Sequence, residues 1–201
     1  MRKIDEASTN VVVVYTDTSA TVNSVTFCND GYLYSGANDN EVHKIDPDTM
    51  GQVDTYTNHT GEVEHLQFGN DGYLYTGSND NSTHKIDPST MGYVASFETT
   101  NTVISTDLSN DGQLYVGTTD NDIHKVNAST MDKVDTYTGH SHRVRSVQLG
   151  SDGYLYSGSD DHEVHQIDPD TLGQVDTYTS HSADVEHVEF GNEGYIYSGA
   201  A

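Results

Sequence analysis

The sequence contains no tryptophan, three prolines and a single cysteine, Cys28. One cysteine excludes a disulfide bond within the chain and a metal cluster held by several thiolates. Because Val25 and Phe27 lie close by, we expect Cys28 to be a buried, unreactive side chain. No apolar run approaches the roughly 18 residues of a membrane-spanning helix. The first ten residues, MRKIDEASTN, lack the apolar segment of a signal peptide.

Positive charge is also scarce, because 8 lysines and arginines stand against 32 aspartates and glutamates, for a net charge of −24. Such a surface repels nucleic acids and anionic membranes. A disordered acidic chain would be poor in aromatic and β-branched residues, whereas this one has 14 tyrosines. We therefore expect a folded protein made for high salt. The cytoplasm of a salt-accumulating halophile is its expected location, and an extracellular location is the alternative.

A glycine-containing motif, typified by NDGYLYSG, occurs five times. Its glycines are separated by 41, 40, 41 and 41 residues: Gly31, Gly72, Gly112, Gly153 and Gly194. A period near 40 combined with strand-forming residues predicts the blades of a β-propeller.

The second repeat shows the expected blade most clearly. Residues 63–68, 73–77, 83–87 and 93–97 are rich in β-forming residues, and turn-forming residues such as Asn, Asp, Gly and Pro separate them. No segment has a helical apolar period. A four-stranded blade cannot bury both of its faces alone, but stacking blades around an axis buries them. The fold class is therefore all-β, with four-stranded antiparallel blades.

The segment from His59 to Asp87 resembles the WD-repeat family of β-propellers. The family's Gly-His pair is matched by Gly139-His140, its strand by residues 144–149 and 185–190, and its turn aspartate by Asp80, Asp120 and Asp161. The Trp-Asp pair of the family is replaced by Ile-Asp or Val-Asn, for example Ile86-Asp87. The portion typified by YLYSGSDDHEVHQIDPDT is also similar to quinoprotein-type and YVTN-type propeller repeats.

The resemblance implies a hydrogen-bond network inside each blade, formed by a histidine, a serine or threonine, an aspartate and the tryptophan. His59, His140 and His181 occupy the histidine position, and the network must lack its tryptophan here. Four other histidines share one position of the third strand, where we expect a packing or rim role: His43, His84, His124 and His165.

Alignment on the period places four whole blades at about residues 22–57, 63–98, 103–138 and 144–179. Residues 2–5 and 10–16 align with a third and a fourth strand, and residues 185–190 and 195–199 with a first and a second strand. We therefore expect a five-bladed ring in one domain, 1–201, whose last blade combines 185–201 with 1–16. The alternative is a piece of a larger propeller whose ends pair between chains. The chain is a monomer in the first case and a homo-oligomer in the second.

Candidate functional residues gather in the loops before the first strands, at 58–62, 99–102, 141–143 and 182–184, and in the Asp-rich turns. The expected binding face comprises His59, Glu62, Asp80, Asp120, His140, His142, Arg143, Asp161, His181 and Asp184. The residues expected to face the channel are Glu64, His65, Arg145, Glu186 and His187. Arg143 and Arg145 form the one cluster without a counterpart in other repeats, and they either compensate nearby carboxylates or contact an anionic ligand.

We expect no cofactor and no specific metal. His65 and His187 with Glu64 and Glu186 lack a defined ligand spacing, and the Asp-rich turns lack the pattern of a calcium loop. The leading hypothesis is a non-enzymatic scaffold that binds a protein or peptide through its loop-rich face. A lectin-like propeller with one small ligand per blade is the second hypothesis, and a five-bladed glycoside hydrolase is the third. The near-identity of the blades disfavours the enzyme, because it offers few singular carboxylates.

Overall fold

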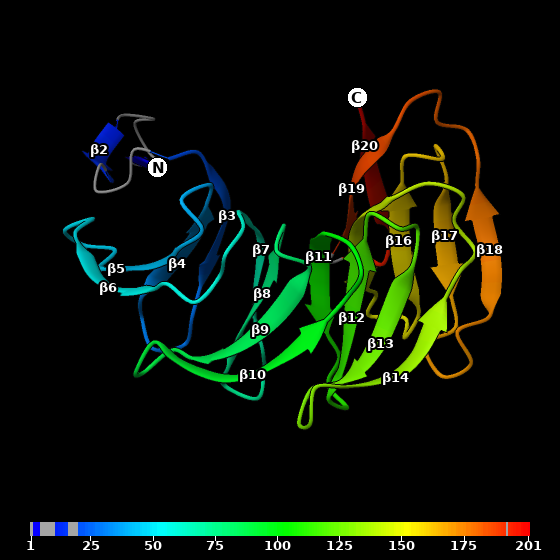
Figure 1. Cartoon of the computed structure of the whole chain (residues 1–201). Coiled ribbons are helices and arrows are strands. Elements are labelled where there is room, and N and C mark those ends of the chain that lie inside the picture. Colours follow the sequence, from blue (N-terminus) through cyan, green and yellow to red (C-terminus); the bar gives the residue numbers. More distant parts are fainter. Residues whose placement is uncertain (1, 5–10, 16–19, 192) are drawn as a thin grey trace.

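The computed structural model describes residues 2–4, 11–15, 20–191 and 193–201, and every regular element in this part of the chain is a β-strand. Four antiparallel sheets of four strands follow one another, with a two-stranded sheet before them and another after them (Figure 1). The half-sheets are β1 (Arg2–Ile4) with β2 (Val11–Val14), and β19 (Val185–Phe190) with β20 (Ile196–Ala200). The described residues form no helix that could span a lipid bilayer.

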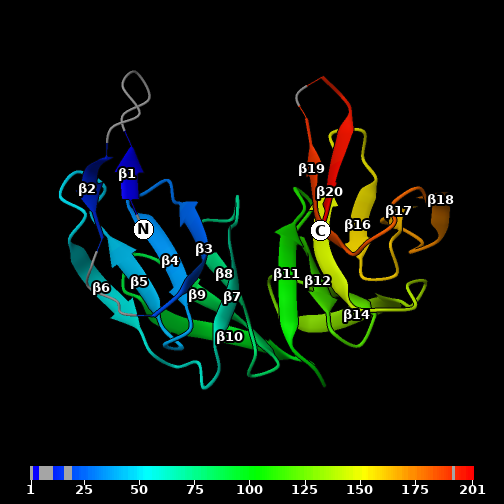
Figure 2. The same ribbon diagram turned by 90° about the horizontal axis from the view of Figure 1, so that it is seen from above.

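The four complete sheets are the predicted blades, each with its strands in chain order. Blade 1 contains β3 (Val22–Phe27), β4 (Leu33–Ala37), β5 (Val42–Ile45) and β6 (Gln52–Tyr56), and blade 2 contains β7 (Val63–Phe68), β8 (Leu74–Ser78), β9 (Ser82–Asp87) and β10 (Gly92–Glu98). Blade 3 contains β11 (Val103–Leu108), β12 (Gln113–Thr118), β13 (Ile123–Asn127) and β14 (Asp132–Tyr137), and blade 4 contains β15 (Val144–Leu149), β16 (Leu155–Ser159), β17 (Val164–Ile167) and β18 (Gln174–Tyr178). Figure 2 shows β3, β7, β11 and β19 facing the inside of the array, and β6, β10, β14 and β18 lying outside.

The turn between the first two strands explains the recurring NDGY motif. In blade 2, Gly72 has a φ of 87°, a left-handed conformation that glycine adopts without strain. The Asp71 carboxylate accepts the backbone N–H of Tyr73 at 3.2 Å, a side-chain hydrogen bond that closes the turn. The turn between the second and third strands uses another left-handed residue, Asn81, with a φ of 70°.

The pair β1–β2 has the register of the third and fourth strands of a blade. Its pairing shifts by one residue between Lys3 and Ile4, as the pairing of β5–β6 does between Lys44 and Ile45, 41 residues later. The predicted alignment of the N-terminal segment with these strands is therefore confirmed for the described residues. Three residues of the aligned segments lie outside them: Asp5, Asn10 and Thr16.

The ring is not closed in the structure. The ring prediction requires β20 to pair with β1, but β1–β2 and β19–β20 are two separate sheets. Figure 2 shows them on opposite sides of the opening of an arc. Each half-sheet stays with its neighbouring blade instead: Tyr15, directly after β2, is buried and donates from its hydroxyl to Gln52 of blade 1 at 2.8 Å.

Adjacent blades meet through a small residue that admits a large one. The second strand of each blade carries a glycine, and a valine at the start of the next blade packs directly on it. A Cβ atom at Gly77 would lie 2.7 Å from Cγ1 of Val103, so no larger residue fits without displacement. The same pairing occurs four times: Gly36 with Val63, Gly77 with Val103, Gly117 with Val144 and Gly158 with Val185.

A second contact between blades joins an aromatic side chain to a histidine. The aromatic residue lies near the end of a fourth strand, and the histidine lies on the third strand of the following blade. The pairs are Tyr15 with His43, Tyr56 with His84, Phe97 with His124 and Tyr137 with His165. All four histidines are buried, which confirms their predicted role in blade packing.

Buried lysines make the third contact between blades. Lys44 donates to the backbone carbonyl of Pro88 in the next blade at 2.7 Å, and Lys85 donates to that of Ala128 at 2.8 Å. The Lys85 ammonium also bonds to Asp71 at 2.8 Å and lies over the ring of Tyr73. These lysines thus join neighbouring blades inside the protein. Because their positive charges are buried, the exterior is more acidic than the composition alone implies. Cys28 is buried, as predicted.

Candidate functional site

Two complete hydrogen-bond networks lie under the loops before β7 and β15. In blade 2, Nδ1–H of His59 donates to Asp80 at 2.8 Å, and its Nε2 accepts the Thr76 hydroxyl at 2.7 Å. Asp80 also accepts the backbone N–H of Thr60 at 2.9 Å, so the network fixes the loop above it.

Blade 4 repeats this geometry with different residues. His140 contacts Asp161 at 2.8 Å and Ser157 at 2.7 Å, and Asp161 accepts the N–H of Ser141 at 3.0 Å. The hydrogen bond of His59 and His140 within the blade, which the resemblance implied, is confirmed. His181 of the last half-sheet contacts Ser198 at 2.7 Å.

A second histidine and a tyrosine extend each network. The ring of His84 stacks on His59 with centroids 3.9 Å apart, and His165 stacks on His140 at 3.8 Å. The Tyr56 hydroxyl lies 2.7 Å from Nδ1 of His84. Ile86, at the position of the tryptophan, is fully buried. The network therefore includes a second histidine and a tyrosine, and a buried isoleucine stands at the tryptophan position.

Burial controls the protonation of these networks. It lowers the pKa of His84 to about 4, with a further contribution from the adjacent His59. Burial likewise lowers the pKa of His140 to about 4, assisted by His165. Burial alone would raise the pKa of Asp80, but the hydrogen bonds from His59, Ser82 and Thr60 bring it well below its ordinary value. The imidazoles of His84 and His140 are thus neutral and Asp80 is ionised at pH 7.

The stacked histidines are poorly arranged to hold a metal. Donor atoms of His59, Asp80 and His84 lie within 4.8 Å of one another, as do those of the equivalent group in blade 4. However, the lone pairs of two nearly parallel rings, 13° apart, run side by side and do not converge on one point. Both nitrogens of His59 are also engaged in hydrogen bonds. We interpret these groups as structural networks.

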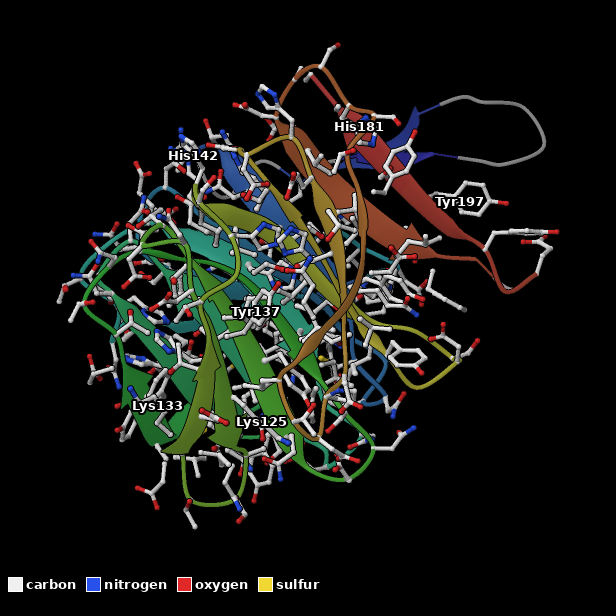
Figure 3. All side chains as sticks on the ribbon, turned by 90° about the vertical axis from the view of Figure 1, so that its right-hand side faces the viewer. Lys125, Lys133, Tyr137, His142, His181 and Tyr197 are labelled. Atoms are coloured by element: carbon white, nitrogen blue, oxygen red, sulfur yellow. The ribbon has the colours of Figure 1, made fainter. Side chains whose placement is uncertain are left out.

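The loops before the first strands and the turns between the second and third strands meet at one face of the molecule. Asn79 donates to Glu62 at 3.0 Å, and Asn121 donates to the carbonyl of Ser141 at 3.2 Å, which links blade 3 to blade 4. Figure 3 shows His142 and His181 at one edge of the molecule and Lys125 and Lys133 at the opposite edge. These bonds join the loop of blade 2 to its neighbouring turn and connect blade 3 to blade 4 on this side of the molecule.

The structure divides the predicted face residues into two groups. His59 and His140 are buried and support the loops, so they are not available to a partner. His142 and Arg143 are exposed. Asp80 and Asp161 belong to the networks, and their side chains are only 9% and 6% exposed. The remaining predicted residues are partly exposed: Glu62, Asp120, His181 and Asp184. In blade 3, where the loop has no histidine, Asp120 bonds instead to Thr100 at 3.0 Å and Asn101 at 3.2 Å.

The two arginines share one carboxylate. Arg143 and Arg145 both bond to Asp160 through their Nε atoms, and Arg145 also reaches Glu186 at 3.1 Å and Asp184 at 3.8 Å. These contacts favour local charge compensation for Arg145. Arg143 is half-exposed, and its bond to Asp160 uses Nε.

A cavity of about 390 Å³ lies between the inner strands. Four of the five residues predicted to face the channel line it, namely Glu64, His65, Arg145 and His187. Glu186 is exposed beside it and pairs with Arg145. Burial lowers the pKa of His65 to about 4, assisted by His187.

Asp107 is a lining residue that sequence reasoning missed. It accepts the backbone N–H of Leu149 at 2.7 Å, and burial raises its pKa to about 6 in spite of that bond, with Glu189 adding to the shift. Comparison of the repeats could have identified Asp107, because it is charged whereas the fifth residue of the inner strand is neutral in the other complete blades. These neutral residues are Thr26, Gln67 and Gln148.

Comparison with known families bears on the two networks. The model of the WD domain, G-beta repeat (WD40) matches residues 50–87 and 131–168. Both matched stretches are similar to a WD40 repeat, which is consistent with a WD-repeat-like propeller family. Each matched segment contains one complete network, that of His59 or that of His140. WD40 repeats typically form non-enzymatic scaffolds for protein interaction. A search of curated proteins found no match to the chain.

Proposed function

We propose that the protein is a non-enzymatic propeller-type scaffold whose loop face binds a protein or peptide partner in a high-salt environment. The observation that carries this proposal is that buried residues support the loops of that face while other residues of the same loops are exposed. Buried His–Asp networks hold the loops from below, while the side chains above them are left to solvent. Such preorganised loops reduce the ordering entropy that binding costs.

Asymmetry of the face supports a single partner over one small ligand per blade. Arg143 has no equivalent in the other blades, and in blade 3 Thr99 stands at the histidine position while Thr100 and Asn101 bond to Asp120. A ligand bound identically by every blade would require identical blades, whereas a partner that spans several loops uses their differences. We also propose a location in the cytoplasm of a salt-accumulating halophile, on the basis of the net charge of −24.

We further propose that the half-sheets β1–β2 and β19–β20 complete a fifth blade by pairing. The register of β1–β2 supports this, since it reproduces a third and a fourth strand. The pairing can occur within one chain, as the sequence predicts, or between chains.

Peptide selection in molar KCl tests the binding function. Peptides selected on the wild-type protein are measured by fluorescence anisotropy against two double variants of equal charge. Glu62→Lys with Asp184→Lys alters the loop face, and Asp54→Lys with Asp135→Lys alters the exposed outer strands β6 and β14. We expect binding to the wild type and to the outer-strand variant, and at least about tenfold weaker binding to the face variant. Equal binding to both variants would refute the assignment of the face.

A further inference from the structure

The contact between neighbouring inner strands is directional. A side chain of one blade accepts a backbone N–H of the next, because inner strands present free amides toward the channel. The third residue of the strand makes this bond in four successive pairs: Ser24 to Leu66, His65 to Thr106, Ser105 to Val147 and Ser146 to Val188. The fifth residue does so in two pairs: Asp107 to Leu149 and Gln148 to Phe190. In all these pairs the accepting side chain belongs to the earlier blade and the donating amide to the later one.

The face of β19–β20 that points away from blade 4 carries the side chains that would accept amides of a following blade. No following blade packs on it among the described residues. His187 and Glu189 occupy the third and fifth positions of β19 and are exposed. Gly199 corresponds to the glycines that receive a valine, yet a Cβ atom added at this position would meet no atom within 4 Å. Tyr178 is 53% exposed, whereas Tyr56, its equivalent in blade 1, is 2% exposed. Tyr197 on β20 is likewise 55% exposed. We call the surface formed by His187, Glu189, Tyr197 and Gly199, with Tyr178 of β18 beside it, the C face.

The free face of β3 in blade 1 has the matching donor features. Val25 is 50% exposed and Phe27 65%, although the residues equivalent to Val25 in the other inner strands are buried. The N–H groups of Val25 and Phe27 correspond to those that donate to a preceding blade, and no preceding inner strand reaches them within the described residues. Val22 corresponds to the valines that seat on glycine. We call this surface, together with the adjoining β1, the N face.

We propose that the N face of one chain binds the C face of a second copy, so that the contact between blades continues from chain to chain. His187 and Glu189 of one copy accept the N–H groups of Val25 and Phe27 of the other, Val22 seats on Gly199, and β20 pairs with β1 to complete the fifth blade. A second copy is the occupant because β1–β2 is held on blade 1 by Tyr15, and Figure 2 shows the two faces of one chain on opposite sides of the opening. The proposal does not depend on the binding function of the loop face.

The contact is head-to-tail, and this gives it a distinctive test by mixing. Phe27→Asp disables only the N face and Tyr197→Asp only the C face, and both side chains are exposed in one chain, so neither change removes core packing. Light scattering after size exclusion in molar KCl gives the mass. We expect the wild type to exceed the 22.0 kDa of one chain, and each variant alone to be a monomer. An equimolar mixture of the two variants retains one intact pair of faces, so we expect it to form a particle of twice the mass of one chain.

Two further variants separate the interface from the fold. Val134→Asp alters an equally exposed valine, 55%, on the outer strand β14 and is expected to leave the assembly unchanged. Gly199→Ala should weaken the assembly about tenfold by crowding the incoming valine, with no change in the melting temperature of the monomer. A monomeric wild type at all concentrations overturns the proposal and indicates closure within one chain. A mixture that stays monomeric also overturns it, because the variants would then share no complementary pair of faces.

Discussion

Removal of one buried hydroxyl tests whether the tyrosine–histidine contact between blades stabilises the array. The Tyr137 side chain is buried, and its hydroxyl lies 2.6 Å from Nδ1 of His165 and 3.1 Å from Oε1 of Gln174. Tyr137→Phe keeps the ring but leaves both groups without this partner. A buried polar group that loses its hydrogen bond costs about 1–3 kcal/mol, so we expect the free energy of unfolding to fall by about 2–3 kcal/mol. For a chain of this length the melting temperature then falls by roughly 4–10 °C.

The matched control is Tyr93→Phe, because Tyr93 is half-exposed and its hydroxyl bonds only to Ser96 within the described residues, at 3.1 Å on the surface. We expect the control to change the free energy of unfolding by less than about 0.5 kcal/mol. Urea unfolding in molar NaCl, followed by circular dichroism, measures both variants. If Tyr137→Phe proves as mild as Tyr93→Phe, the histidine contact contributes nothing to the stability of the blades and the reasoning is refuted.

Three other predictions concern the channel, the blade contact and the net charge. Burial raises the pKa of Asp107 to about 6, above its ordinary 3.8, so its stabilising contribution is complete below pH 3.8 and is lost as the pH rises through 6. Asp107→Asn should therefore stabilise the protein by about 2–3 kcal/mol at about pH 8 and by almost nothing at about pH 3.5, which urea unfolding at both pH values measures. Gly77→Ala should cost about 1–3 kcal/mol because its Cβ meets Val103, whereas Gly199→Ala in a monomeric background should cost less than about 0.5 kcal/mol. The melting temperature should rise with KCl from about 0.1 M to molar concentrations, since the Debye length shortens from about 10 Å to about 3 Å.

Each of these predictions has an outcome that contradicts it. Equal effects of Asp107→Asn at both pH values would show that the carboxylate is not destabilised by burial. Equal costs at the two glycines would mean that the close approach to valine is unimportant. A melting temperature that does not respond to KCl would show that repulsion among the carboxylates does not limit stability.

Period and turn chemistry were sufficient to predict the blades. The glycine spacing and residues such as Asp71 and Gly72 mark the same turn in every repeat, and β1–β2 has the register that the alignment predicts. The histidine networks were predictable only through the resemblance. The stacking of His84 on His59 was not, because these residues are 25 positions apart in the sequence and meet only when β9 lies beside the loop before β7. The channel carboxylate Asp107 was missed because its environment comes from a neighbouring blade.

Local information therefore determined the strands, the turns and the acidic surface of this protein, since each depends on residues close together in the chain. Tertiary structure decided which polar residues are buried beneath the loops and which are exposed to solvent. His140 is buried, whereas His142, two residues later, is exposed. It also decided that the half-sheets stand apart, because curvature of the array is the sum of many contacts between blades, such as Gly77 with Val103. A repeat of about 40 residues specifies a blade and its neighbour, but the angle at which successive blades pack is set by side chains from both.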